Sequence, residues 1–167
     1  MTASPCCAVR TARFEDLEAV IDVHAGDSAD RRRPVATSER QREMWRRMMN
    51  TRDLTVYVAV VGDALVGTAT AMVMPNITYG CAPTMFVEAV VVVPRYRRQG
   101  VATAMIQRVL ADARATGCNK VQLLSHKRHA TDGAHHLYAG LGFEPEAEGF
   151  RQYLRGAPTV VSAARSP

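Results

Sequence analysis

The stretch of residues 85–102, MFVEAVVVVPRYRRQGVA, constrains the fold of this chain more than any other feature. Its first half is dominated by valine, and a short run of β-branched residues such as 86–93 predicts a strand buried on both faces. Pro94 ends that strand, because proline has no N–H to donate to the next ladder bond. Apolar residues then recur at helical spacing from Val101 onward. The stretch therefore predicts a strand, a tight turn and a helix at the centre of the domain.

The predicted turn has the chemistry of an anion-binding site. The first turn of a helix has unpaired backbone N–H groups and the positive end of the helix dipole. Gly100 lets a ligand approach the main chain closely, and the small Ala102 keeps that approach open. Arg97 and Arg98 add positive charge suited to phosphate oxygens. We therefore expect the turn to bind a diphosphate.

Two motifs narrow the choice of diphosphate. The chain contains neither G-x-x-x-x-G-K-[ST], the nucleotide P-loop, nor G-x-G-x-x-G, the dinucleotide loop. The run Arg97-x-x-Gly100-x-Ala102 after a valine-rich strand instead resembles the coenzyme A loop, Q/R-x-x-G-x-G/A, of the GCN5-related N-acetyltransferase (GNAT) superfamily. Downstream, residues 134–143 (AHHLYAGLGF) resemble that family's A-x-x-x-Y-x-x-x-G-F segment. Order, spacing and local structure agree, and the resemblance covers about residues 9–154.

The resemblance implies an α+β fold, with a mixed, mostly antiparallel and partly splayed sheet that is flanked by helices. The sequence pattern agrees, since apolar residues at helical spacing predict helices and β-rich runs predict strands. Ser38 and Gln41 have the spacing of a capping box at the start of the second helix. The expected helices cover residues 13–25, 38–50, 101–117 and 131–140. The expected strands cover residues 7–10, 54–61, 64–74, 86–93 and 120–125, followed by a final strand pair within 143–154.

The resemblance also implies how coenzyme A binds. The diphosphate would lie against a cradle formed by Arg97, Arg98, Gln99, Gly100, Val101, Ala102 and Thr103. The pantetheine arm would fill the gap between the splayed strands and bond to the main chain of Val90, Val91 and Val92, which are assigned by position alone. Many homologues place an asparagine seven residues before the tyrosine of the second motif to bond the pantetheine. Thr131 stands there in this chain, and a threonine hydroxyl can make one such bond.

Two residues are expected to move protons during acetyl transfer. Tyr138 matches the family's tyrosine, whose hydroxyl sits by the sulfur and can protonate the leaving thiolate; the alternative is a core tyrosine bonded elsewhere. Glu88 is the carboxylate of the central strand, where an ionisable group is costly to bury unless it is paired or functional. Family members often carry a glutamate here that deprotonates the amine, frequently through water. A structural glutamate, or one paired with an arginine, is the alternative for Glu88, and His126 and His129 are the alternative bases.

Length, composition and charge limit the other readings. The 167 residues, 47% of them hydrophobic, suffice for one domain, 1–167, whose last residues, about 156–167, are expected to form a flexible tail. The net charge of +5 is compatible with a nucleic-acid partner, but no nucleic-acid motif accompanies it, and a polyanionic cofactor needs only part of it. Histidines 126, 129, 135 and 136 lack the spacing of zinc ligands, so no metal is expected.

The cysteines and the N-terminal residues indicate the cellular compartment in which the protein is expected. The four cysteines form no C-x-x-C pair, and the N-terminus has no apolar segment typical of a signal peptide. No apolar run approaches the roughly 18 residues that a membrane helix needs. We therefore expect a cytoplasmic protein with no membrane partner.

The expected function is transfer of an acetyl group from acetyl-CoA, as cosubstrate, to a primary amine of a small molecule or peptide. The amine would attack directly in a ternary complex, because neither Cys81 nor Cys118 lies in a recognisable nucleophile context. The alternatives are a non-catalytic acyl-CoA-binding or regulatory module of the same fold, and a basic nucleic-acid binder. The sequence leaves three questions open: the identity of the amine acceptor, whether the protein forms a homodimer, and whether it uses acyl groups longer than acetyl. Arginines 31–33, Lys127 and Arg128 hint at an anionic acceptor, but they could equally serve the 3′-phosphate of CoA.

Overall fold

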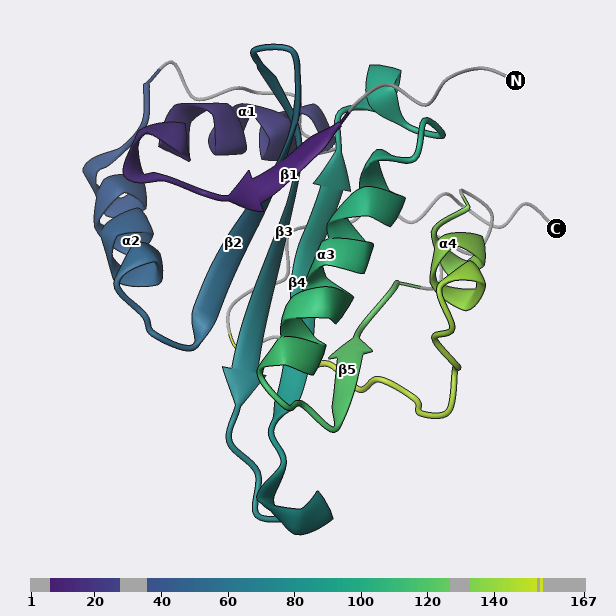
Figure 1. The fold of residues 1–167 in the computed structure, drawn as a ribbon. Helices are drawn as coiled ribbons and strands as arrows, with labels where there is room; N and C mark the ends of the chain where they lie inside the picture. The colour runs from purple at the N-terminus through teal and green to yellow at the C-terminus, as the bar shows by residue number, and fades with distance from the viewer. Residues whose placement is uncertain (1–6, 28–35, 127–132, 153, 155–167) are drawn as a thin grey trace, which may run out of the picture.

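The computed structural model describes residues 7–27, 36–126, 133–152 and 154. This part of the chain forms a five-stranded sheet in the order β1-β2-β3-β4-β5, flanked by helices (Figure 1). Neighbouring strands are antiparallel except β4 and β5, which are parallel, so the predicted α+β architecture is confirmed. The strands are β1 (Ala8–Thr11), β2 (Leu54–Val61), β3 (Ala64–Met74), β4 (Thr84–Val92) and β5 (Lys120–Leu123). The helices are α1 (Leu17–Asp27), α2 (Glu39–Met49), α3 (Val101–Ala115) and α4 (Ala134–Gly140).

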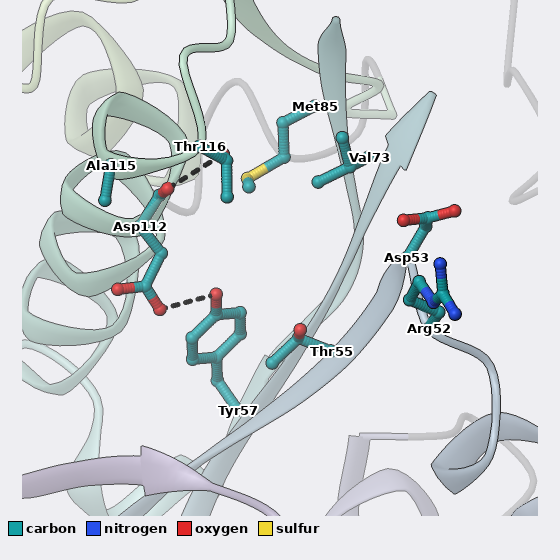
Figure 2. A pocket seen from close by; sticks show the side chains of 9 residues that line it. All are labelled: Arg52, Asp53, Thr55, Tyr57, Val73, Met85, Asp112, Ala115 and Thr116. Atoms are coloured by element: carbon teal, nitrogen blue, oxygen red, sulfur yellow. Dashed lines mark hydrogen bonds between the residues drawn. The ribbon is translucent and has the colours of Figure 1, made fainter. Parts of the chain in front are cut away.

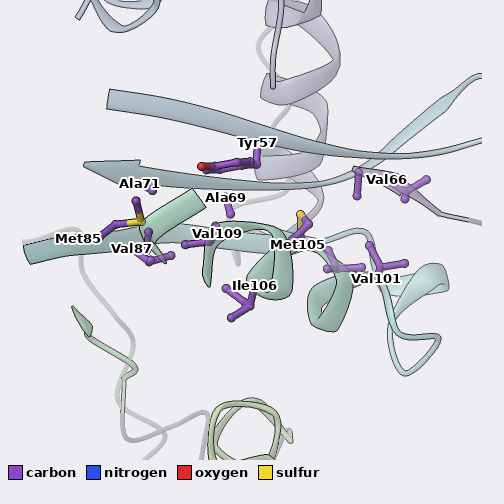
Figure 3. Close-up of a cluster of buried hydrophobic side chains, with 13 residues drawn as sticks. Tyr57, Val66, Ala69, Ala71, Met85, Val87, Val101, Met105, Ile106 and Val109 are labelled. Atoms are coloured by element: carbon purple, nitrogen blue, oxygen red, sulfur yellow. The ribbon is translucent and has the colours of Figure 1, made fainter. Parts of the chain in front are cut away.

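Helices pack on both faces of the sheet (Figure 1). On one face α3 buries Met105, Ile106 and Val109 against strand residues that include Tyr57 and Met85 (Figure 3). On the other face α1 and α2 close a second apolar cluster, made of Ala12, Val20, Trp45, Val56 and Val58. Fully burying one large apolar side chain stabilises a fold by roughly 1.5–3 kcal/mol. Hydrophobic burial on both sides therefore holds the three layers together.

The N-terminal half of α3 lies close to β3 at Gly67. A Cβ atom on Gly67 would lie 3.0 Å from Met105 Cε, 3.2 Å from the Val91 carbonyl oxygen and 3.3 Å from Val101 Cγ1. These separations are shorter than ordinary van der Waals contact, so a larger residue would push the helix and the strand apart. The missing side chain at Gly67 therefore sets how closely the start of α3 approaches the sheet.

β4 is not buried on both faces, so that prediction is wrong. Met85 and Val87 are buried against α3, whereas Phe86 and Glu88 project from the other face and are exposed. Residues 85–88 alternate in the way expected where one face of a strand is covered and the other is open to solvent. α1 contacts β4, but the buried apolar cluster that α1 and α2 form includes no residue of β4, so Phe86 and Glu88 stay open to solvent.

Three predictions concern the first 74 residues, namely the start of the first helix, the start of the second helix and the first hairpin. The capping box of α2 is confirmed, since Gln41 N–H donates to Ser38 Oγ at 3.3 Å and Ser38 N–H donates to Gln41 Oε1 at 2.8 Å. The hairpin of β2 and β3 is confirmed with the bounds that the sequence predicts. The first helix, predicted over 13–25, is a 3-10 turn, Phe14–Asp16, followed by α1, Leu17–Asp27, and Arg13 makes no side-chain cap bond. The Asp16 carboxylate accepts from Arg13 N–H at 2.6 Å instead.

The final strand pair predicted within 143–154 is wrong, since residues 143–152 and 154 form no strand. Glu144, Glu146 and Glu148 occupy every second position, which makes one face of an extended segment too polar to bury. Between these glutamates stand Pro145, Ala147 and Gly149, which offer little apolar surface. Residues 144–149 therefore lack an apolar face that could pack on the sheet.

The remaining elements differ from prediction mainly at their ends. β5 ends at Leu123, two residues before the predicted end at Ser125. α4 is described from Ala134, and the first part of the predicted helix, like the expected tail at 156–167, lies outside the described residues. No helix in the described ranges is long and apolar enough to cross a membrane.

Candidate functional site

The connection between β4 and α3 reverses the chain in two short steps. A 3-10 turn, Pro94–Tyr96, follows the strand, and residues 97–100 lead into the helix. Arg98 (φ 61°) and Gly100 (φ 82°) both have left-handed backbone conformations. Glycine adopts this conformation freely, whereas an L-residue with a side chain does so at a cost of roughly 1–2 kcal/mol. Turns of this kind direct successive N–H groups to one side, which makes a concave donor site for an anion.

The N-terminus of α3 presents backbone donors to a ligand. Gly100 caps the helix without a side-chain bond, and Ala104 N–H donates to the Gly100 carbonyl at 2.9 Å. By helix geometry, the N–H groups of residues 101–103 have no carbonyl within the helix to bond. A Cβ atom on Gly100 would meet no atom within 4 Å, so the space beside the turn is open. This donor set and this open approach fit a diphosphate.

Side chains of the turn also hold it in place. Arg97 Nε donates to the Val92 carbonyl at 3.0 Å, and Gln99 Nε2 donates to the Arg95 carbonyl at 2.7 Å. Arg97 therefore ties the turn to the end of β4, a role that the sequence did not reveal. The Arg98 guanidinium lies against Gly133, in space that a side chain at position 133 would need. Arg98 thus brings the turn and the start of α4 together.

β4 and β5 stop pairing halfway along β4. Their parallel ladder runs from the pair Thr84–Lys120 to the pair Val87–Leu123. In the described chain, no strand pairs with that edge of β4 beyond Val87. Strands that separate leave backbone N–H and C=O groups available to another partner. The splayed parallel pair expected from the sequence is therefore present.

The ladder between β3 and β4 shows how the valines of β4 are oriented. Val93 N–H donates to the Val66 carbonyl at 2.9 Å, and Val92 lies opposite Gly67. In an antiparallel ladder, the backbone groups of successive residues face alternate edges. The N–H and C=O of Val92 therefore face away from β3, toward the unpaired edge, and those of Val91 face β3. Among valines 90–92, Val92 has the orientation that the expected main-chain bonds need, and Val91 has the opposite one.

A β-bulge precedes these valines. The register of β3 and β4 shifts so that Ala89 and Val90 lie opposite the single residue Ala69. Ala89 has φ 54°, a left-handed conformation that is strained for alanine. Bulges and strained residues are over-represented beside active sites, where they redirect the chain. The bulge here separates the paired half of β4 from its open half.

The segment around Tyr138 ends α4 with a Schellman motif. Phe143 N–H donates to the Tyr138 carbonyl and Gly142 N–H to the Ala139 carbonyl, both at 3.0 Å. Gly142 has φ 84°, the left-handed conformation that this ending requires. The rings of Tyr138 and Phe143 meet edge to face, with centroids 5.7 Å apart. The Y-x-x-x-G-F pattern thus has a physical basis, because the glycine makes the turn and the phenylalanine packs on the tyrosine.

Glu88 is exposed, and its carboxylate has no hydrogen bond or ion pair within the described ranges. Neither a buried structural role nor pairing with an arginine of those ranges accounts for it. The alternative base His126 is exposed just beyond β5, and His129 and Thr131 lie outside the described residues. His135 is exposed on α4. No group of three His, Cys, Asp or Glu side chains among the residues that the structure describes could hold a metal ion.

A hollow of about 470 Å³ lies at the end of α3 remote from the turn (Figure 2). There the Tyr57 hydroxyl donates to Asp112 Oδ2 at 2.9 Å, and Arg108 Nε donates to both oxygens of the same carboxylate at 3.0 and 3.1 Å. Burial, and then the bond to Asp112, raise the pKa of Tyr57 above its ordinary value. Sequence reasoning missed this network because Tyr57 and Asp112 are 55 positions apart, although Arg108 and Asp112 have the i, i+4 spacing of a helical ion pair. None of the predicted site residues lines the hollow, whose lining consists of Arg52, Asp53, Thr55, Tyr57, Val73, Met85, Asp112, Ala115 and Thr116.

Comparisons with known proteins identify the class. A model of the acetyltransferase (GNAT) family matches residues 21–143, and a search of curated proteins finds no match. Among solved structures, an acetyltransferase of Trypanosoma brucei is 25% identical, with a TM-score of 0.74 over 89% of this chain and 99% of its own. A transcriptional regulator from Bacillus halodurans C-125 is 23% identical, with a TM-score of 0.81 over 88% of this chain and 99% of its own. The aminoglycoside N-acetyltransferase AAC(6')-Iy, in complex with CoA, is 20% identical, with a TM-score of 0.71 over 93% of this chain and 99% of its own.

The fold and the strand–turn–helix unit are those of an acetyltransferase-like α+β domain. Because the family match covers most of the chain, this protein belongs to the acetyltransferase (GNAT) family. The matched residues include β4, the turn, α3 and the Tyr138 segment through Phe143. The family resemblance stated from the sequence is therefore confirmed.

Proposed function

We propose that this protein transfers an acetyl group from acetyl-CoA to a primary amine. The observation that carries the proposal is the continuity of two elements, the open turn at residues 97–103 and the edge of β4 at Val92, with which no described strand pairs. Coenzyme A has a diphosphate joined to a long pantetheine arm rich in amide groups, and it needs both elements in this order. Family membership supports the proposal, as does the CoA complex of the similar enzyme AAC(6')-Iy.

The chain offers a distinct group to each part of the cosubstrate. The N–H groups at the start of α3 would bind the diphosphate, with Gly100 giving close access and Arg98 adding positive charge. Val92 N–H would bond to the pantetheine arm where β5 has turned away, and Val90 lies beside it at the bulge. Thr131 is proposed to add a hydroxyl contact, as the resemblance implies.

The proposed chemistry assigns one proton transfer to each side of the reacting centre. Glu88 accepts a proton from the acceptor's ammonium group, directly or through water, because only the neutral amine is a nucleophile. The amine nitrogen then bonds to the acetyl carbonyl carbon, and the carbon–sulfur bond breaks. Tyr138 donates its hydroxyl proton to the departing thiolate and recovers a proton when the nitrogen loses one to form the amide. The products are the acetylated amine, the free thiol of CoA and one proton released to solvent.

Thermal unfolding tests the cosubstrate. A ligand at about 100 times its Kd stabilises the folded state by roughly 2.7 kcal/mol, which raises the unfolding temperature of a domain of this size by about 5–10 °C. We expect this shift with acetyl-CoA and with CoA, and no comparable shift with ATP or NAD. An equal shift with ATP would indicate general phosphate binding, and the absence of a shift with CoA would reject the proposed binding site.

Release of free thiol tests the reaction itself. Purified protein is incubated with acetyl-CoA and a panel of primary amines, the thiol is followed by a chromogenic disulfide reagent, and the amide is identified by mass spectrometry. We expect equal amounts of thiol and acetylated amine. Binding of CoA without thiol release from any amine would support the non-catalytic acyl-CoA-binding module instead.

A further inference from the structure

We infer that the amine acceptor carries an apolar body, aryl or alkyl, and that Met72 and Phe86 select it. The inference rests on the proposed function, because it places the acceptor's nitrogen beside Glu88. Three features of the sheet face that bears Glu88 support it. The face has an apolar surface, this surface is exposed to solvent, and one carboxylate, that of Glu88, lies two residues from Phe86 along β4.

The apolar surface lies immediately next to Glu88. Met72 on β3 is directly opposite Phe86 on β4, and the neighbouring cross-strand pair is Thr70 with Glu88. Side chains two residues apart on a strand share a face, so Phe86 and Glu88 project to the same side, away from α3. Directly opposite residues have Cβ atoms about 5 Å apart. Met72 and Phe86 therefore form one continuous surface beside the carboxylate.

This surface is exposed in the folded protein. Met72 is 46% exposed and Phe86 37%, and Met74, further along β3 on the same face, is exposed as well. Their neighbours Ala71 and Met85, which face α3, are buried. Adjacent large apolar side chains that a fold leaves in solvent are typical of a binding surface. A methionine adapts to the shape of a ligand and an aromatic ring gives broad apolar contact, so the pair suits an apolar group.

The strands that form this apolar surface contribute one carboxylate to it, which matches one ammonium group. Glu88 is the only carboxylate in β3, β4 and β5. The other charged residue of these strands, Lys120, lies at the far end, with Nζ 5.1 Å from the centre of the Tyr79 ring. An acceptor with several ammonium groups would need several carboxylates, and a sugar would lose hydrogen bonds to water against an apolar surface. The face therefore fits a monoamine with an apolar body better than a polycationic sugar.

The spacing of the charge and the apolar surface is also suitable. Residues two apart on a strand are separated by about 6.6 Å. Two or three methylene groups between a nitrogen and an aryl or alkyl group cover a comparable distance. An amine bound at Glu88 could therefore place its apolar body on Phe86 and Met72 while its nitrogen points toward the open edge of β4.

The test compares two primary amines that differ in their bodies. The purified protein is saturated with acetyl-CoA, and thiol release is measured with 2-phenylethylamine, which is apolar, and with glucosamine, which is polar. We expect kcat/KM to be at least ten times higher for 2-phenylethylamine. Met72→Gln and Phe86→Thr should each reduce that preference several-fold, mainly by raising KM for the amine, and should leave KM for acetyl-CoA unchanged. Both positions are exposed, and thermal unfolding confirms that the variants fold.

Met44→Gln is the matched control. Met44 on α2 is 49% exposed, close to the exposure of Met72, and it belongs to a different surface. The control makes the same substitution at a similarly exposed site. It should leave kcat/KM unchanged for both 2-phenylethylamine and glucosamine. A loss of preference in the control as large as in Met72→Gln would overturn the inference, since the effect would then not depend on the face beside Glu88.

The other outcomes are distinguishable from one another. Glucosamine or kanamycin acetylated as fast as 2-phenylethylamine, or a preference that survives both variants, would overturn the inference and leave the proposed function standing. Failure to acetylate any amine would reject the proposed function, and the inference with it. A dimer in sedimentation velocity that Met72→Gln dissociates would assign the face to a second copy of the chain and overturn the inference as well.

Discussion

Glu88 and Tyr138 lie on opposite sides of the sheet. Glu88 projects from the face on which α1 and α2 pack, whereas Tyr138 packs against the apolar cluster beneath α3. Groups placed in this way can meet at one reacting centre where the sheet is open between them. β4 is open in this sense beyond Val87, where its ladder with β5 ends. The splayed edge is therefore the place where a base from one side and an acid from the other could serve a single transfer.

Conservative substitutions at these two residues test their roles. Glu88→Gln and Tyr138→Phe change each side chain little in shape but remove its ability to move a proton. We expect each to lower kcat by about 100-fold, in the range typical of a general base or acid. The thermal shift with acetyl-CoA should persist, because neither side chain is proposed to bind the cosubstrate. Full turnover by both variants on a verified acceptor would remove these role assignments while leaving the fold and family intact.

Phe143 should act through Tyr138. Its ring packs edge to face on Tyr138, a contact worth about 1 kcal/mol beyond simple burial. Phe143→Leu keeps an apolar side chain but releases the tyrosine ring, and we expect kcat to fall about tenfold because a small misplacement of a catalytic group slows the reaction. KM for acetyl-CoA should stay the same, and Phe143→Tyr, which retains the ring, should retain kcat.

The positioning role of Phe143 has its own control. In a Tyr138→Phe background there is no hydroxyl left to position, so Phe143→Leu should have little further effect on kcat. An equal tenfold loss in both backgrounds would show that Phe143 contributes to stability or packing independently of Tyr138.

A carboxylate placed at the start of α3 should separate folding from cosubstrate binding. Thr103 is the third residue of α3, where a negative charge stabilises a helix by about 0.3–1 kcal/mol. Thr103→Asp should therefore leave the unfolding temperature of the ligand-free protein unchanged or slightly raised, yet repel the diphosphate and raise the Kd for CoA at least tenfold in calorimetric titration. Ala111→Asp adds the same charge at an exposed site about 12 Å further along the helix and should not change the Kd. Undiminished affinity in Thr103→Asp would place the diphosphate elsewhere.

Tyr57 predicts a pH dependence of stability on the alkaline side. Its pKa is raised in the folded protein from an ordinary value of 10, first by burial and then by the bond to Asp112. Folding therefore favours the neutral phenol, so its contribution to stability is complete below the unfolded pKa and is lost as the pH rises toward the folded one. Tyr57→Phe removes both the titration and a hydrogen bond, at a cost of about 1 kcal/mol near neutral pH.

The test for Tyr57 compares the unfolding temperature as a function of pH in the wild type and in Tyr57→Phe. The unfolding temperatures of the wild type and of Tyr57→Phe should converge as the pH is raised from about 9.5 to 11, because only the wild type loses this contribution. The other tyrosines are common to both proteins and cancel in the difference. A constant difference across this range would show that Tyr57 does not carry the predicted dependence.

Local signals in the sequence predicted much of the fold. The capping box at Ser38, the hairpin that joins β2 to β3 and the end of β4 before Pro94 all depend on residues within a few positions of one another. The turn at residues 97–100 belongs to the same group, because a glycine and the start of a helix identify it. The presence of a tight turn before α3 could therefore be predicted without knowledge of the rest of the structure, whereas its binding of a diphosphate stays a prediction.

Features that depend on distant neighbours could not be predicted. The valine run of β4 suggested burial on both faces, since β-propensity does not reveal which helix covers which face. The bulge at Ala89 has no glycine to mark it, and the bond from Arg97 to Val92 depends on a turn geometry that residue types do not determine. Tyr57 and Asp112 meet only because β2 and α3 pack together.

The bulge adds one residue to β4 relative to β3. Before Ala89 the odd-numbered Met85 and Val87 face α3, and after it the even-numbered Val90 and Val92 pack against the same cluster. The extra residue Ala89 therefore changes the positions that face α3 from odd-numbered to even-numbered. Because Ala89 and Val90 lie opposite the single residue Ala69, deletion of Ala89 would remove the bulge and its strain and leave Val91 and Val92 opposite Thr68 and Gly67. β4 should therefore tolerate the loss of Ala89 with the same register and the same valine faces, while the chain between Glu88 and the turn at residues 97–100 becomes one residue shorter.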